Sequence, residues 1–189
     1  MTCFNWEIDF LTALGNLHGQ IGPMIGDLSL MDWIMVFFSK LGDAGLLWIG
    51  ISLIMLIPKN TRKWGIQMLV AIAVTFVIGN LIVKNLFHRE RPYVQVPELD
   101  ALRIIAKPSE YSFPSGHTMN GFTASITMLF WDKRFGIPAV VVAAIIAFSR
   151  MYNIVHFPTD ILAGIGIGII SACIVQIVFR RYEKKRLSM

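Results

Sequence analysis

The stretch Phe135–Phe179, FGIPAVVVAAIIAFSRMYNIVHFPTDILAGIGIGIISACIVQIVF, contains two long apolar runs joined by a short polar segment. The first run ends at roughly Val155, and the second covers Pro158–Phe179. Each is close to the ~20 residues that a helix needs to cross a hydrocarbon layer ~30 Å thick. Two helices that cross in succession leave the polar segment between them at one face of the membrane. This stretch therefore predicts a membrane-embedded helical hairpin.

The rest of the chain repeats the pattern. Trp64–Val83 and Ser115–Trp131 are further apolar segments, and Ala44–Pro58 is shorter but continues the apolar run before it. Hydrophobic residues make up 55% of the 189 residues and charged residues 15%, whereas a soluble domain has about 25% charged residues. We predict an all-α, polytopic membrane helix bundle with five to six transmembrane helices, formed by residues 1–189 as a single domain.

Residues 1–43 form an N-terminal region with weaker signals. Within Phe4–Leu17 the apolar side chains recur at helical spacing opposite acidic residues such as Glu7, which predicts an amphipathic helix in the membrane interface. Leu30–Leu41 is apolar but only ~18 Å long as a helix, too short to cross alone. It either lies on the outer face or joins Ala44–Pro58 in one long tilted helix, and a sixth crossing stays open.

The placement of the basic residues predicts the orientation. The formal net charge is +5, which could indicate a nucleic-acid partner, but the cations lie between and after the apolar segments. Ten of them fall on one side if the chain alternates through the spans: Lys59, Arg62, Lys63, Lys133, Arg134, Arg180, Arg181, Lys184, Lys185 and Arg186. The positive-inside rule makes that side, with the C-terminus, cytoplasmic. We expect membrane lipids as neighbours and no nucleic acid.

Three polar islands remain, and all of them fall on the opposite, extracytoplasmic side. They are Lys84 with Arg91-Pro92, then Pro114-Ser115-Gly116-His117, then Ser149-Arg150 followed by His156 and Asp160. Ionisable residues are costly at a membrane edge, and those that occur there usually have a functional role. Fixed cations can neutralise a phosphate, and two histidines can divide the roles of nucleophile and proton donor. The islands therefore predict phosphoryl transfer through a histidine.

Local sequence supports an anion site. Ser115-Gly116 stands where a helix begins, and the first-turn N–H groups of a helix bind anions readily. Arg91 precedes a proline, which holds its backbone extended. Asp160 lies four residues after His156, so it can accept a hydrogen bond from one imidazole nitrogen and leave the other free to attack phosphorus.

In this order, the motifs Lys-x6-Arg-Pro, Pro-Ser-Gly-His and Ser-Arg-x5-His-x3-Asp resemble the three-part signature of the type-2 phosphatidic acid phosphatase superfamily. Bacterial class A acid phosphatases and vanadium haloperoxidases share this signature. The resemblance covers about Trp64 to Phe179, so residues 64–179 would be the catalytic core.

The resemblance implies a role for each motif residue. His156 would be the nucleophile that forms a phosphohistidine, with Asp160 in support, and His117 would protonate the leaving oxygen and then activate water. The phosphoryl oxygens would be held by Lys84, Arg91, Ser115, Gly116 and Arg150. No metal or other cofactor is implied. Relatives often carry glycine where this chain has Ile154 and tyrosine where it has Phe157, and the first change can alter the turn.

The long loop from Phe87 to Phe113 is the remaining feature of the predicted outer face. It contains Pro92, Pro97 and Pro108, so a continuous helix is not expected there. Residues 93–113 mix charged and apolar side chains, which suits either a short amphipathic lid or a solvated linker.

A lipid phosphate or pyrophosphate is the expected substrate. By the resemblance, undecaprenyl pyrophosphate, the carrier recycled in cell-wall biogenesis, is favoured, with phosphatidylglycerophosphate and phosphatidic acid as alternatives. A soluble haloperoxidase does not suit the apolar spans, and a non-catalytic lipid-phosphate binding or transport protein would typically lose one of the catalytic residues. The run Gly164-x-Gly166-x-Gly168 allows close helix packing, either within the chain or in a homo-oligomer.

Overall fold

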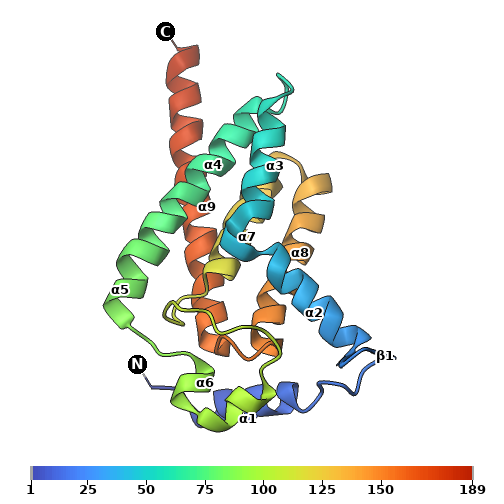
Figure 1. Cartoon of the computed structure of the whole chain (residues 1–189). Helices are drawn as coiled ribbons and strands as arrows, with labels where there is room; N and C mark the ends of the chain where they lie inside the picture. Colours follow the sequence, from blue (N-terminus) through green and yellow to red (C-terminus); the bar gives the residue numbers. More distant parts are fainter. Residues whose placement is uncertain (1, 189) are drawn as a thin grey trace.

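The computed structural model describes residues 2–188, and the chain folds as a helical bundle (Figure 1). The α-helices are α1 (Asn5–Gly15), α2 (Leu30–Leu41), α3 (Leu46–Leu56), α4 (Arg62–Phe76), α5 (Lys84–Phe87), α6 (Pro92–Gln95), α7 (Gly116–Trp131), α8 (Lys133–Tyr152) and α9 (Pro158–Leu187). Short 3-10 turns, η1 (Asp43–Gly45) and η3 (Pro97–Leu102), and a π-helical segment, η2 (Val77–Val83), connect some of them. A small antiparallel hairpin, β1 (Met24–Ile25) with β2 (Leu28–Ser29), precedes α2. The all-α class is confirmed.

Three segments are long and apolar enough to cross a membrane among the described residues: Arg62–Gln95, Lys133–Tyr152 and Pro158–Arg186. Helices α2 and α3, with η1 between them, form a fourth candidate that is bent by 47°. Helix α7 has 16 residues and so spans about 24 Å. With α7, these are the five apolar segments that the sequence indicates. The protein is a polytopic membrane bundle.

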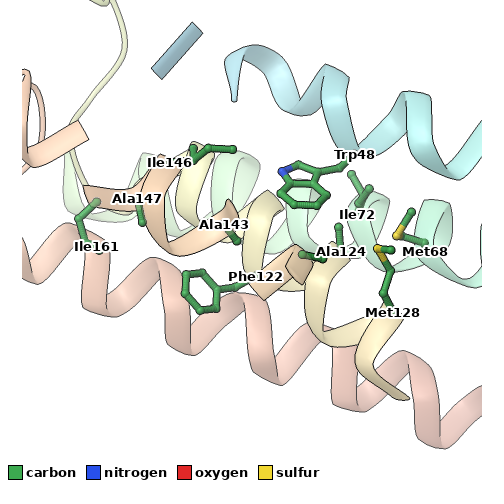
Figure 2. Close-up of a cluster of buried hydrophobic side chains, with 11 residues drawn as sticks. Trp48, Met68, Ile72, Phe122, Ala124, Met128, Ala143, Ile146, Ala147 and Ile161 are labelled. Atoms are coloured by element: carbon green, nitrogen blue, oxygen red, sulfur yellow. The ribbon is translucent and has the colours of Figure 1, made fainter. Parts of the chain in front are cut away.

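Helix α7 lies inside the bundle, packed against α4, α8 and α9. Figure 2 shows part of the buried core, in which Trp48, Ile72 and Phe122 come together from α3, α4 and α7. The glycine run of α9 permits the close approach to α7. A Cβ at Gly168 would lie 2.8 Å from the carbonyl oxygen of Met119, and one at Gly164 would lie 3.0 Å from Thr118 Cβ. These two glycines therefore have their packing partner within the chain.

The bend between α2 and α3 has a local cause. Ala44 and Gly45 adopt left-handed backbone conformations, with φ of 50° and 70°, which no α-helix continues through. The chain turns here, and η1 places Asp43 beside the N-terminal end of α7. The sequence left open whether Leu30–Leu41 lies on the outer face or joins Ala44–Pro58 in one long tilted helix. The structure rules out one continuous helix, because α2 and α3 form a pair bent by 47°.

Helix α1 crosses the end of the bundle that is opposite the C-terminus, next to α6 and η3 (Figure 1). A helix over this stretch is confirmed, but the face assigned to Glu7 is wrong. Glu7 is fully buried together with Leu11, while Phe4 and Trp6 are each 51% exposed. Helical periodicity assigns a carboxylate to the solvent side, because unpaired charges are rarely buried. Glu7 has a buried partner and therefore lies on the inner side of the helix.

The loop between Phe87 and Phe113 packs onto the protein. Leu99, in η3, is 2% exposed and joins Leu11, Ile154 and Phe157 in a small hydrophobic cluster. The described loop is therefore not a solvated linker. That it acts as a lid stays a prediction.

Candidate active site

The three motifs meet at a cavity of about 990 Å³. Six of the eight predicted site residues line it: Lys84, Arg91, Gly116, His117, Arg150 and His156. The other two, Ser115 and Asp160, are fully buried. They lie behind the cavity wall, where the backbone N–H of Ser115 donates to the carbonyl oxygen of Asp160 over 3.2 Å. All eight residues thus form one continuous site.

His156 lies in the turn between α8 and α9, and its two ring nitrogens face different groups. Nε2 is 3.3 Å from Nη1 of Arg91 on the cavity side. Nδ1 is 3.5 Å from Oδ2 of Asp160 and 3.4 Å from Oγ of Ser112. With its proton on Nδ1, the ring presents the Nε2 lone pair to the cavity, which is the form a nucleophile requires.

Burial sets the charge of this imidazole. His156 is 2% exposed, and desolvation lowers its pKa well below the usual value, with the positive charge of Arg91 acting in the same direction. Asp160 opposes this shift but does not overcome it. His156 is therefore neutral at physiological pH, which is the form that a nucleophilic role requires.

The turn that presents His156 depends on Ile154. This residue is fully buried and has a φ of 58°, a conformation that glycine adopts freely and a β-branched residue rarely does. The resemblance to the phosphatase motif leads one to expect glycine here. The structure keeps the left-handed turn despite the side chain, which packs among Leu11, Leu99 and Phe157.

Asp160 is held by more groups than the sequence suggests. Its Oδ2 accepts hydrogen bonds from Ser112 Oγ at 2.5 Å and from the N–H of Phe157 at 2.8 Å, while Oδ1 accepts from Nη1 of Arg89 at 2.6 Å. Reasoning from the sequence missed Arg89, which is fully buried. The signal that could have found it is its place two residues before Arg91.

His117, on the first turn of α7, has a carboxylate partner of its own. Its Nε2 is 2.9 Å from Oδ1 of Asp43. Gly42 makes room for this contact, because a Cβ there would lie 2.7 Å from Cδ2 of His117. Reasoning from the sequence missed Asp43; a Gly-Asp pair that interrupts an apolar run was the available signal.

The N-terminus of α7 faces the cavity as expected. The side chain of Ser115 caps no backbone N–H of α7, and its Oγ instead accepts a hydrogen bond from Thr118 Oγ1 over 3.1 Å. A Cβ at Gly116 would meet only Asn80 Oδ1, at 3.7 Å. Gly116 lines the cavity, so the backbone N–H groups of this turn lie at its wall, where an anion binds well.

The three cations are arranged around the same space. Lys84 Nζ is paired with Glu110 Oε2 at 2.5 Å, and Arg91 Nε donates to the carbonyl oxygen of Glu110 at 2.7 Å. Lys84 lowers the pKa of the Glu110 carboxyl, so this loop residue carries a negative charge at the cavity. Arg150 donates to Ser39 Oγ. The positive charge available for a phosphate is therefore partly neutralised by the loop.

The described residues, 2–188, contain no group of three or more His, Cys, Asp or Glu side chains placed to hold a metal ion. What the cavity does offer is three cations, a helix N-terminus and two histidines that each face a carboxylate. This set can bind a phosphoryl group, attack it at phosphorus and exchange protons with the departing oxygen.

Comparison with known proteins agrees with this chemistry. The profile of the PAP2 superfamily matches residues 64–184, and the chain belongs to that superfamily. An undecaprenyl-diphosphatase of Sulfolobus acidocaldarius is 34% identical over 138 residues, which are 72% of this chain and 65% of that protein. The chain therefore spans just under two thirds of that relative's length.

Solved structures share the fold. The crystal structure of Aquifex aeolicus LpxE superposes with a TM-score of 0.75 at 24% identity, over 93% of this chain and 99% of that one. A PAP2-type phosphatidylglycerolphosphate phosphatase from Bacillus subtilis gives a TM-score of 0.71 at 22% identity, over 93% and 85%. The bundle is thus the fold of PAP2 membrane phosphatases.

Proposed function

We propose that the protein is an integral-membrane lipid phosphatase that converts undecaprenyl pyrophosphate to undecaprenyl phosphate through a phosphohistidine intermediate. The observation that carries the proposal is the placement of His156, which presents Nε2 to the cavity beside Arg91 while Asp160 lies behind Nδ1. The name of the Sulfolobus acidocaldarius relative, an undecaprenyl-diphosphatase, supports the pyrophosphate substrate.

In the first step, Nε2 of His156 attacks the terminal phosphorus, and the bond from phosphorus to the bridging oxygen breaks. The leaving lipid phosphate takes a proton from His117. Lys84, Arg91 and Arg150 surround the transferred group and stabilise the negative charge on its equatorial oxygens. The backbone donors for the anion are the N–H groups of Gly116 and the residues after it in the first turn of α7. The N–H of Ser115 is not among them, because it already donates to the carbonyl oxygen of Asp160.

In the second step, His117 takes a proton from water, and the resulting hydroxide attacks the phosphohistidine. The bond between phosphorus and nitrogen breaks, inorganic phosphate leaves, and both histidines return to their starting states. Asp43, 2.9 Å from His117 Nε2, supports the protonated form of this ring. No metal ion takes part in the proposed mechanism.

The proposed site faces the outside of the cell. The C-terminal end of α9 lies at one end of the bundle, and α6, which precedes the loop that lines the cavity, lies at the other (Figure 1). Because the C-terminal end carries the basic cluster Arg180–Arg186, the positive-inside rule makes it cytoplasmic.

A phosphatidylglycerophosphate or phosphatidic acid phosphatase is the second candidate. It is favoured by the fold shared with the Bacillus phosphatidylglycerolphosphate phosphatase, and the phosphate-binding groups read only the phosphoryl end that all these lipids share. A non-catalytic lipid-phosphate binding or transport role is the third.

The test is phosphate release by the purified protein in detergent with EDTA, from undecaprenyl pyrophosphate, phosphatidylglycerophosphate and phosphatidic acid in parallel, with His156→Ala as control. We expect release that survives EDTA, is fastest from the pyrophosphate and vanishes in the variant. A preference for either glycerolipid would replace the substrate, and release abolished by EDTA would overturn the metal-free mechanism. A folded protein that releases phosphate from none of the three would favour the binding role.

A further inference from the structure

A buried ion cluster lies directly behind Asp160. The guanidinium of Arg89 bridges two carboxylates, donating from Nη1 to Asp160 Oδ1 at 2.6 Å and from Nη2 to Glu7 Oε2 at 2.7 Å. All three side chains are fully buried. The face of the Phe157 ring lies 4.2 Å from the Arg89 guanidinium carbon, which fixes the plane of the fork.

Glu7 links this cluster to the first turn of α9. Its Oε1 accepts a hydrogen bond from Thr159 Oγ1 at 2.5 Å and from the Thr159 N–H at 3.2 Å. Arg89 also donates to Thr159 Oγ1, at 2.6 Å. The N-terminal helix α1 is therefore joined, through one carboxylate, to the residue that precedes Asp160.

The geometry decides which oxygen of Asp160 faces the nucleophile. Arg89 occupies Oδ1, so Oδ2 is left to accept from Ser112 and the Phe157 N–H and to face His156 Nδ1. Without Arg89 the carboxylate of Asp160 could rotate about its Cβ–Cγ bond, because the energy of this rotation varies little with the angle. Arg89 thus sets the orientation on which the imidazole depends.

The charges decide how strongly Asp160 acts. A single guanidinium beside Asp160 would neutralise it and weaken its support for a positively charged imidazole. Glu7 supplies a second negative charge, so the three side chains together carry one net negative charge. That charge lies within a low-dielectric region next to His156, where its effect is large.

We propose that Arg89 and Glu7 are positioning residues for the His156–Asp160 pair, and that helix α1 is in this way part of the catalytic apparatus. The inference rests on the proposed phosphohistidine function. Neither residue touches the cavity that holds the substrate, so their effect falls on the chemical step and not on binding.

The test compares Glu7→Gln with Asp9→Asn, a change of the same kind at an exposed position of the same helix. Glutamine keeps the length of the side chain and an oxygen that accepts from Arg89 or Thr159, but removes the charge. We expect kcat to fall about 10- to 100-fold in Glu7→Gln with KM within about twofold, as for other residues that orient a catalytic group. Asp9→Asn should match the wild type in both.

A structural role predicts a different order of variants. If Glu7 only held α1 in place, Glu7→Gln would keep more of kcat than Glu7→Asp, because glutamine has the same length as glutamate. If the charge of Glu7 acts on Asp160, Glu7→Asp keeps more of kcat than Glu7→Gln does. A Glu7→Gln protein with wild-type kcat would overturn the proposal, whatever its thermal stability. Should Glu7→Gln not fold, Thr159→Val removes the hydroxyl that bonds both partners, and a kcat equal to that of Thr159→Ser would overturn it equally.

The outcome also separates this inference from the proposed function. Nuclear magnetic resonance of nitrogen-labelled histidine reports the environment of the His156 ring without turnover, and His156→Ala assigns its signal among the four histidines. We expect the Nδ1 signal to move in Glu7→Gln and not in Asp9→Asn. An unmoved signal would contradict the positioning role even in a protein that releases no phosphate, whereas absent release alone would contradict only the phosphatase.

Discussion

Replacing Gly42 by alanine tests whether the position of the His117 ring controls turnover. Gly42 has an ordinary φ of −84°, so the backbone accepts alanine, and the obstacle is space. The new Cβ would lie 2.7 Å from His117 Cδ2 and 2.7 Å from Ile146 Cγ2. Ile146 is fully buried in the core, which leaves the His117 ring and the turn around Gly42 as the parts that move.

The size of the effect follows from the overlap. Carbon atoms pack at about 3.5–4.0 Å, so the ring and the turn must separate by about 1 Å. Overpacking of this kind costs about 1–3 kcal/mol of stability, and a displacement of about 1 Å at a catalytic group can lower the rate about 100-fold. We expect kcat of Gly42→Ala to fall about 10- to 100-fold and the thermal midpoint to fall by a few degrees.

The assay is phosphate release at saturating lipid, together with a thermal unfolding curve in the same detergent. Gly50→Ala is the matched control, because a Cβ there meets nothing within 4 Å, and alanine within a helix is about 0.5–1 kcal/mol more stable than glycine. A Gly42→Ala protein that turns over at the wild-type rate would refute the reasoning, since the His117 ring would then not need its present position.

Three further predictions concern pH, the loop and the turn. Because burial and Arg91 lower the pKa of His156, its neutral form persists as the pH falls, so the acid limb of kcat/KM should lie below about pH 6.5. An acid limb above that value would contradict the assignment. Glu110→Gln removes the carboxylate that is paired with Lys84, which frees this cation for phosphate. Because the Glu110 side chain is 68% exposed, we expect inhibition by inorganic phosphate to strengthen only about two- to fivefold. Unchanged inhibition would show that the ion pair does not compete with phosphate. Ile154→Gly relieves a left-handed backbone conformation that costs about 1–2 kcal/mol of stability, but it removes a buried side chain that contributes about 2–5 kcal/mol. The thermal midpoint should therefore fall. A rise would mean that the backbone strain outweighs the packing of the side chain.

The motif residues could be predicted from the sequence because each stands at the end of an apolar segment. An alternating chain brings such ends to one side of the membrane, so the apolar pattern by itself places Lys84, His117 and His156 on a common face. The helix lengths follow in the same way from hydrophobic runs, and Leu30–Leu41 coincides with α2.

The supporting residues could not be predicted in this way. Glu7 and Arg89 are 82 residues apart, and Asp43 and His117 are 74 apart, and neither pair has a periodicity that indicates contact. A charged residue on a helix is normally solvated, so helical periodicity assigns Glu7 to the outer face. Its burial depends on the simultaneous presence of Arg89 and Thr159, which only the packed structure shows.

The central claim is that phosphate passes through His156. The direct measurement is to mix the protein with undecaprenyl pyrophosphate radiolabelled at its terminal phosphate, quench within the first turnover in alkali, and locate the label by peptide mass spectrometry. We predict a phosphorylated, acid-labile and alkali-stable His156 in the wild type that is absent from His156→Ala. Turnover by the wild type with no label on the protein would contradict the account.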